Sequence, residues 1–321
     1  MLAALHGLQV HLAEVERHIE SALASSELKV SELIAQLGPF HGKMLRPALV
    51  MLVAETLGTA GDTHHRLGAA LEMIHTATLI HDDLIDDSDT RRGRQTAHVR
   101  FGNTTSVLLG DYFYTHAFNL IADLNEPALM KRLTVTTNIM CRGELHQQCA
   151  ARDVDLSESE YNRIIYAKTA ALTELAGEMG AVEGTPEQRR AAAAYGRACG
   201  MAFQIADDCL DFSGDPKKVG KTLSTDIERG RLTLPILRLL ASSDHGQGSR
   251  AELEARLLSV SSPEDVSAVR RMVIDGGGVA AALSTARAYA TEAQGQLEGL
   301  PAGPERQRLW DLAEFIVARD F

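Results

Sequence analysis

The sequence lacks any excess of positive charge. Its 321 residues carry a formal net charge of −11, whereas sequence-independent binding of nucleic acid needs Lys and Arg clustered against phosphates. We therefore exclude nucleic acid as a partner. Small anionic ligands stay compatible with this charge, because a local basic cluster or bound cations can reverse the potential within one site.

Cysteine patterns that signal zinc or disulfides are also missing. None of the four cysteines forms a CxxC pair, and no His stands at zinc-ligand spacing. We expect them to be small apolar residues within helices, in a protein of the reducing cytoplasm. They are Cys141, Cys149, Cys199 and Cys209.

Long hydrophobic runs are absent as well. The most apolar segment, Pro47 to Ala54, is far shorter than the roughly 20 residues that a membrane helix needs. The first twenty residues lack the basic start, apolar stretch and cleavage site of a secretory signal. We therefore expect a cytoplasmic protein that does not span a membrane, although it could contact one when it releases an apolar product.

Strand signals are nearly absent, and helix signals are everywhere. Apolar residues recur at three- and four-residue spacing along almost the whole chain. Ser157 with Glu160, and Thr185 with Gln188, fit capping boxes, and Ser262 precedes a proline that suits the first helical position. No segment has the composition of a linker. These patterns predict a single large all-α domain spanning residues 1–321.

The most informative feature is a cluster of aspartates after an apolar helical stretch. Asp82 and Asp86 are four residues apart, as are Asp83 and Asp87, so we expect each pair to share a helix face. Like charges on a partly buried helix repel each other and lose hydration, so a cation must offset them. Mg²⁺ suits this role because it binds one or two carboxylates together with water and phosphate oxygens.

A second cluster repeats the arrangement. Asp207 and Asp211 are four residues apart, with Asp208 beside them, again within an apolar helical stretch. Near the first cluster, Arg91 and Arg92 supply guanidinium groups that match phosphate bidentately. Two acidic clusters with adjacent arginines predict a site for divalent cations and phosphate.

Two other patterns are misleading. Glu72-x-x-His75 resembles one element of a di-iron helical bundle, but no second Glu has a His three residues on. The stretch from Gly214 to Thr222 resembles a phosphate-binding P-loop, but it has five residues between its glycines where four are required. We reject both interpretations.

In combination, the motifs resemble those of the trans-isoprenyl diphosphate synthase family, also called polyprenyl synthetases. The resemblance extends from about Gly42 to Pro235. Its motifs, in chain order, are Gly42-Lys43-x-x-Arg46-Pro47, His75, Asp82–Gly93, Gly143-Glu144-x-x-Gln147, Lys168-Thr169, Phe203-Gln204-x-x-Asp207-Asp208-x-x-Asp211, and the stretch from Gly220-Lys221 to Thr233-Leu234-Pro235. His41 and Arg231 depart from the family, which usually has glycine and lysine there.

The resemblance implies an all-α fold of helices around a central cavity, usually in a homodimer. It implies that Asp82, Asp86 and Asp207 hold Mg²⁺, about two to three ions per site. The residues that it marks as catalytic are Asp82, Asp83, Asp86, Arg91, Lys168, Asp207, Asp208 and Lys221. Those that face the allylic diphosphate are Arg91, Lys168, Thr169, Gln204 and Lys221, and those that hold isopentenyl diphosphate are Lys43, Arg46, His75 and Arg92.

The chemistry that the resemblance implies explains these residue types. An allylic C–O bond breaks, the double bond of isopentenyl diphosphate attacks the cation, and a proton is lost. Metal ions and basic side chains stabilise the negative charge on the leaving diphosphate, and an apolar cavity keeps water from the cation. The sequence shows no dedicated general base.

Product length is expected to depend on the residues just before the first cluster. In this family, bulky aromatics four or five residues before the first aspartate stop chain growth early. Here these residues are Thr78 and Ala77, so we expect a medium or long product. The floor of the cavity is expected lower down, near Met73, Ile74 or the aromatics 112–114.

Three alternatives stay open. Other helices could close the cavity early and yield a farnesyl or geranylgeranyl product. A terpene cyclase shares the all-α fold and an Asp-rich first motif, but its second metal motif normally mixes Asn or Asp, Ser or Thr, and Glu. A non-catalytic subunit of a heteromeric prenyltransferase typically loses the aspartate motifs, whereas both are present here.

Overall fold

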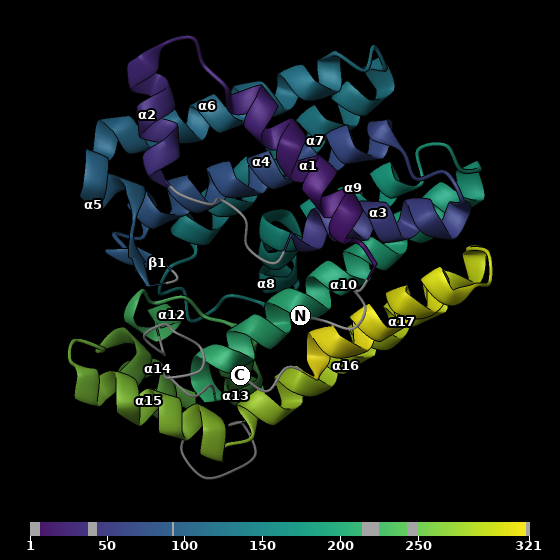
Figure 1. The fold of residues 1–321 in the computed structure, drawn as a ribbon. Coiled ribbons are helices and arrows are strands. Elements are labelled where there is room, and N and C mark those ends of the chain that lie inside the picture. Colours follow the sequence, from purple (N-terminus) through teal and green to yellow (C-terminus); the bar gives the residue numbers. More distant parts are fainter. Residues whose placement is uncertain (1–6, 38–43, 92, 214–224, 243–249, 319–321) are drawn as a thin grey trace. The chain divides into compact units, whose positions relative to one another are not determined.

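A computed structural model describes residues 7–37, 44–91, 93–213, 225–242 and 250–318 (Figure 1). The chain forms two compact units, each described here by itself. The first unit comprises Met1–Val135, Leu175–Ala193 and Leu297–Trp310, and the second comprises Thr136–Glu174, Ala194–Gln296 and Asp311–Phe321. The prediction of one domain over residues 1–321 stays a prediction.

Helices make up almost all of the described structure, so the predicted all-α class is confirmed. The elements wholly in the first unit are α1 (Gln9–Leu23), α2 (Leu28–Leu37), α3 (Leu45–Leu57), α4 (Asp62–Ile85), β1 (Thr90–Arg91), β2 (Arg94–Gln95), α5 (Ala97–Phe101), α6 (Asn103–Ala122) and the 3₁₀ turn η4 (Leu297–Gly299).

The second unit contains a further set of helices. These are α8 (Glu158–Ile165), the π-helical turn η2 (Tyr166–Ala170), α12 (Thr225–Glu228), α13 (Leu234–Ser242), α14 (Arg250–Leu258), α15 (Pro263–Asp275) and α16 (Gly278–Gln296). Four helices contribute residues to both units, namely α7 (Pro127–Cys149), α9 (Ala171–Gly180), α10 (Pro186–Ser213) and α17 (Pro304–Val317).

The core of the first unit forms around α3 and α4. Every residue from Pro47 to Ala54 is buried, as expected for a helix that is apolar on all sides. Helix α4 packs against α1, α3 and α6 (Figure 1). Gly110 lets α6 come close to α4, since a Cβ there would lie 2.1 Å from Nε2 of His81.

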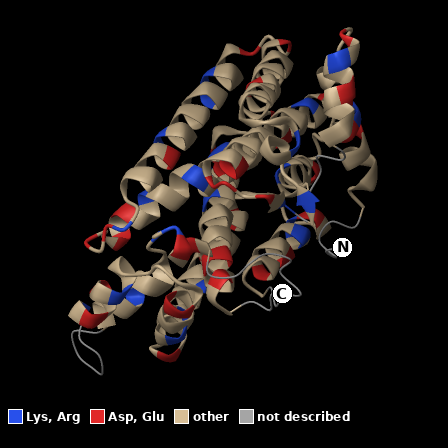
Figure 2. Cartoon of the chain, turned by 90° about the vertical axis from the view of Figure 1, so that its left-hand side faces the viewer, with Lys and Arg blue, Asp and Glu red and all other residues tan. Residues whose placement is uncertain are grey.

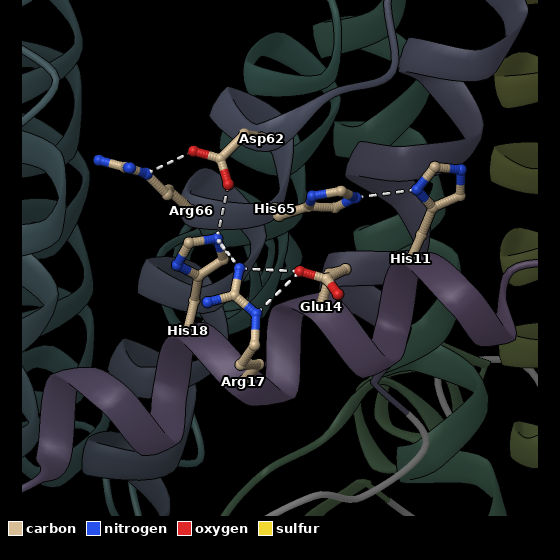
Figure 3. A network of polar contacts seen from close by, with 7 residues as sticks. All are labelled: His11, Glu14, Arg17, His18, Asp62, His65 and Arg66. Carbon is tan, nitrogen blue, oxygen red and sulfur yellow. Dashed lines mark hydrogen bonds and ion pairs between the residues drawn. The ribbon is translucent and has the colours of Figure 1, made fainter.

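Polar contacts join α1 to the start of α4 (Figure 3). Nδ1 of His11 lies 2.8 Å from Nε2 of His65, and Nε2 of His18 lies 2.8 Å from the carboxylate of Asp62. Asp62 also accepts a hydrogen bond from Arg66 at 2.8 Å. The network therefore orients α1 along α4, the helix that carries the first aspartate cluster.

The second unit has its own apolar core. Buried residues from α8, α10, α13, α15 and α16 form one cluster, with α13 lying against α16 (Figure 1). The predicted helix starts are confirmed: Ser157 and Ser262 cap α8 and α15, and Thr185 exchanges hydrogen bonds with Gln188 at the start of α10.

Charged side chains of both signs lie interspersed along the helices (Figure 2). Among the described residues, no helix is both long enough and apolar enough to cross a bilayer.

Candidate active site

The first aspartate cluster lies at the C-terminal end of α4. Asp82 and Asp86 are half-buried, while Asp83 points into the protein with 9% of its side chain exposed. The expectation that Asp83 and Asp87 share a helix face is wrong. The helix ends at Ile85, and Asp87 adopts a left-handed φ of 47° with its side chain 99% exposed.

Arg91 binds the buried aspartate of this cluster. Its Nε donates to both carboxylate oxygens of Asp83, at 2.8 and 2.9 Å. Burial raises the pKa of Asp83, and the guanidinium of Arg91 partly counteracts this. Strand β1 pairs with β2 in a short hairpin that brings Arg91 back to the end of α4. Asp83 and Arg91 therefore position each other, and Arg92 lies outside the described residues.

The second cluster lies within α10. Asp207 and Asp211 are half-buried, and Asp208 is buried. Asp211 accepts a hydrogen bond from the backbone N–H of Asp226 at 3.2 Å. Burial raises the pKa of Asp208 well above its usual range, and the carboxylate of Asp226 adds to this. In each cluster the second of the two adjacent aspartates, Asp83 or Asp208, is thus the buried one.

Three side chains form a hydrogen-bonded relay to Asp208. The hydroxyl of Tyr161 donates to Oδ2 of Asp208 at 2.6 Å, and Nε2 of Gln204 donates to Oδ1 at 2.8 Å. Oγ1 of Thr169 donates to Oε1 of Gln204 at 2.6 Å. Burial and the neighbouring Asp208 raise the pKa of Tyr161, so its hydroxyl keeps its proton. Predicted residues Thr169, Gln204 and Asp208 therefore lie together.

The π-helical turn η2 positions Lys168 and Thr169 between α8 and α9. Such turns are rare and frequently occur at functional sites. Nζ of Lys168 lies 3.0 Å from Oε2 of Glu144 on α7. The packing here leaves no room for a side chain at Gly143, because a Cβ there would lie 2.3 Å from that of Ala167. Close helix packing thus sets the position of this turn.

Sequence reasoning did not assign a role to Tyr161 or Asp226. Burial raises the pKa of Asp226, and the cationic groups of Arg231 and Lys168 counteract this. Arg231, which replaces the usual lysine, lies 3.7 Å from the carboxylate of Asp226. Tyr161 stands two helical turns before Lys168, a spacing that could have marked it as sharing the same side of the helix.

Among the residues expected to hold isopentenyl diphosphate, Arg46 and His75 are described. Burial lowers the pKa of Arg46, and the carboxylate of Glu72 counteracts this. Nε of Arg46 is buried without a hydrogen-bond partner among the described residues, as expected for a group that awaits an anion. His75 is half-buried. Lys43 and Lys221 lie outside the described residues, as does His41.

The residues expected to set product length lie on α4, one turn before the first cluster. Ala77 is fully buried, and Thr78 is half-buried with its hydroxyl donating to the carbonyl of His75 at 2.7 Å. On the neighbouring α6, Phe113 is fully buried, and the ring of Tyr114 stacks against His81 at 6.1 Å. Ala77 is therefore enclosed by packing, and α6, which packs against α4, contributes aromatic side chains to this part of the unit.

The donor chemistry of both clusters fits a hard divalent cation. Each presents two half-buried carboxylates at a spacing of one helical turn, and oxygen ligands are those that Mg²⁺ prefers. Within either cluster, no group of three or more metal-binding side chains is found among the described residues. A cation held by one cluster therefore needs further oxygen ligands, such as water or the phosphate oxygens of a substrate.

Comparisons with known proteins agree with this chemistry. Residues 28–273 match the family model described as Polyprenyl synthetase. The chain is 37% identical over 296 residues to the octaprenyl diphosphate synthase of Haemophilus influenzae, covering 90% of this chain and 89% of that protein.

Solved structures show the same fold. The polyprenyl synthase of Caulobacter crescentus, in complex with calcium and isoprenyl diphosphate, matches with a TM-score of 0.92 and 34% identity over 99% of this chain and 97% of that one. The decaprenyl diphosphate synthase of Rhodobacter capsulatus matches with a TM-score of 0.90 and 34% identity over 98% and 97% of the two chains.

Proposed function

Because the chain belongs to the polyprenyl synthetase family and is a prenyl-transferring enzyme, we propose that it condenses isopentenyl diphosphate with an allylic diphosphate such as farnesyl diphosphate. The product is a medium- or long-chain all-trans polyprenyl diphosphate. The observation that carries the proposal is the common plan of the two clusters. In each, a protein side chain donates to one buried aspartate, and two half-buried aspartates stand at a spacing of four residues beside it.

Asp82, Asp86 and Asp207 are proposed to hold Mg²⁺, about two to three ions per site. When bound, these ions stabilise the negative charge that develops on the leaving diphosphate. The proposal is supported by the half-buried position of all three carboxylates. Asp83 and Asp208 are proposed to act as positioning residues, since Arg91 binds one and Tyr161 binds the other.

The allylic diphosphate is proposed to meet Arg91, Lys168, Thr169, Gln204 and Lys221. Arg91 and Lys168 supply positive charge where the C–O bond breaks. Each is already oriented by a carboxylate, Arg91 by Asp83 and Lys168 by Glu144. Their side chains therefore need little reorganisation when the charge on the leaving group develops.

The diphosphate of isopentenyl diphosphate is proposed to meet Lys43, Arg46, His75 and Arg92. This diphosphate stays intact, so basic groups without a metal are appropriate. Support comes from the buried Nε of Arg46, which has no hydrogen-bond partner among the described residues. A bound phosphate oxygen supplies the missing acceptor.

A medium or long product is proposed because Ala77 and Thr78 leave space where an aromatic residue would stop growth. Each helical turn left open adds about 5 Å of depth. The names of similar proteins, octaprenyl and decaprenyl diphosphate synthases, support this length. The central cavity itself remains a prediction.

Assembly and location are proposed as well. We propose that the protein is a homodimer, that it acts in the cytoplasm, and that it touches a membrane only to release its product. The single domain over residues 1–321 is likewise proposed, supported by a family match that crosses the boundaries of both units.

The function is tested with the purified chain, farnesyl diphosphate, isopentenyl diphosphate and Mg²⁺, followed by mass analysis of the products. We expect consumption of isopentenyl diphosphate and products longer than geranylgeranyl diphosphate. Excess chelator should abolish the reaction, and added Mg²⁺ should restore it. A reaction that does not consume isopentenyl diphosphate indicates a cyclase or a non-catalytic subunit, and a product that stops at geranylgeranyl contradicts the proposed length.

Ala77→Phe tests the length determinant separately. We expect a shorter product, because the ring occupies space one turn before Asp82. Val99→Phe, an exposed position on α5, serves as the control and should leave product length unchanged. An Ala77→Phe enzyme that makes the wild-type product excludes Ala77 from the cavity.

A further inference from the structure

The buried Tyr161 has no role in the function described so far, yet its hydroxyl donates a short hydrogen bond to the second aspartate cluster. It lies 2.6 Å from Oδ2 of Asp208 and is fully enclosed on α8. A buried phenol is ordinarily satisfied by a backbone carbonyl or water. Here the phenol donates instead to the carboxylate of Asp208, the residue next to the proposed metal ligand Asp207.

The relay has a direction. Tyr161 and Gln204 both donate to Asp208, so the amide N–H₂ of Gln204 faces Asp208 and its Oε1 faces Thr169. Thr169 has one hydroxyl proton, and that proton goes to Gln204 at 2.6 Å. The orientation of Thr169 therefore depends on Asp208, which lies two hydrogen bonds away through Gln204.

Tyr161 restrains the end of this relay. Asp208 has two carboxylate oxygens, and each receives one described side-chain donor. Without the phenol, Gln204 would be the one side-chain donor to the carboxyl group among the described residues, and the group could then rotate about its terminal torsion. Gln204 would lose its defined acceptor, and Thr169 would lose its defined orientation.

We propose that Tyr161 is a positioning residue for prenyl transfer, which fixes the side-chain position of Thr169 through Asp208 and Gln204. The inference rests on the proposed function, in which Thr169 meets the allylic substrate. It assigns to Tyr161 an effect on the reacting complex and none on the binding of either substrate in the ground state.

The test replaces Tyr161 with Phe, which removes only the hydroxyl. We expect kcat to fall about fivefold, the size of one misplaced hydrogen bond, with KM for both substrates within about twofold of wild type. Tyr195→Phe is the matched control. That tyrosine is also fully buried and lies on α10, the helix of Asp208, but its hydroxyl is near Cys199. The kcat of the Tyr195→Phe enzyme should match that of wild type.

A double-mutant cycle separates positioning from a general structural role. In a Thr169→Val background, Tyr161→Phe should change kcat by less than about twofold, because the target of the relay is already gone. Replacing Tyr161 with 4-aminophenylalanine, which keeps a donor at the same place, should recover most of kcat. Multiplicative losses in the cycle, or a Tyr161→Phe enzyme indistinguishable from Tyr195→Phe, overturn the proposal.

Two further controls keep the outcome decisive. If Tyr161→Phe does not fold, Asp208→Asn replaces it in the cycle with Thr169→Val. Multiplicative losses then overturn the relay, and the absence of a further loss supports it. If wild type and Tyr195→Phe both fail to consume isopentenyl diphosphate, the proposed function fails, which differs from any failure of the relay.

Discussion

The two aspartate clusters look alike in the sequence but differ in the structure. The first lies at the end of α4, where the helix stops and a half-exposed arginine, Arg91, binds the buried Asp83. The second lies inside the long helix α10, where the fully buried Tyr161 and the half-buried Gln204 bind Asp208. A charged partner orients one cluster, and neutral donors orient the other.

This difference assigns distinct tasks to similar motifs. A helix end followed by a hairpin can bring a basic side chain, oriented by the buried aspartate, to a phosphate. A helix interior held by neutral hydrogen bonds keeps its carboxylates in one place without adding positive charge. In both clusters the buried aspartate accepts hydrogen bonds from protein side chains. The residues that we propose as metal ligands, Asp82, Asp86 and Asp207, are half-buried.

The largest effect is expected from the half-buried aspartates. Asp82→Ala and Asp207→Ala should each lower kcat by about 10²–10³-fold, because each removes a proposed ligand of the Mg²⁺ ions that would stabilise the leaving diphosphate. Steady-state kinetics at saturating Mg²⁺ measures this. Asp87→Ala is the control, since Asp87 lies beyond the helix with its side chain 99% exposed. If Asp87→Ala lowered kcat as much as Asp82→Ala does, the end of α4 at Ile85 would not separate metal ligands from other aspartates.

The helix packing near the second cluster should tolerate an added methyl group less well than the packing near the first. A Cβ at Gly200 would lie 2.6 Å from the backbone Cα of Ala170, whereas one at Gly110 would meet the side chain of His81. We expect Gly200→Ala to lower the free energy of unfolding by about 1–3 kcal/mol, and Gly110→Ala by less, because a ring can move and a backbone cannot.

Urea unfolding measures both, with Gly295→Ala as the control. Gly295 lies in α16 with nothing within 4 Å of an added Cβ, so alanine there should stabilise the protein slightly. Equal losses at Gly200 and Gly110 would show that the second cluster is not the more tightly packed one.

Removing Arg91, the charged partner of the first cluster, should lower the free energy of unfolding by less than Gly200→Ala does. Arg91→Met leaves Asp83 buried without its guanidinium, and we expect a loss of about 1 kcal/mol in the free energy of unfolding. The figure is far below that of a fully buried pair because 35% of the Arg91 side chain is exposed. Arg94→Met, on the partner strand and exposed, should change nothing measurable. A larger loss than that of Gly200→Ala would reverse the order proposed for the two clusters.

The smallest effect concerns pH. Burial lowers the pKa of His64 and of His65, both on α4, and α10 contains no histidine. A depressed histidine pKa means that the unfolded chain binds protons more readily. Its contribution to stability is therefore fully present above the unfolded pKa of about 6.5 and is lost as the pH falls toward the folded pKa.

His64→Leu should weaken this dependence by up to about 1 kcal/mol between pH 8 and pH 5.5. The difference between variant and wild type is measured by urea unfolding at each pH, so that other titrating groups cancel. An unchanged pH dependence would show that folding does not lower the pKa of His64.

Much of the site could be predicted because its signals lie between residues that are close in the sequence. The capping box of Ser157 and Glu160 depends on residues three apart, and the pairing of Asp82 with Asp86 needs only helical spacing. The position of Asp87 could not be predicted, because no local signal before it marks the helix end at Ile85. Tyr161 was missed because its partner Asp208 lies 47 residues away and only packing brings them together.

The sequence by itself determined the all-α class, the residue types of both clusters and the family, because helical periodicity and motif spacing are local properties. Only the tertiary structure decided which aspartate of each cluster is buried. That choice depends on which side of α4 and α10 packs against other helices, and on whether Arg91 or Tyr161 lies there to receive the carboxylate. Burial and long-range hydrogen bonding, which no local pattern encodes, thus distinguish the buried carboxylates Asp83 and Asp208 from the half-buried ones that we propose as metal ligands.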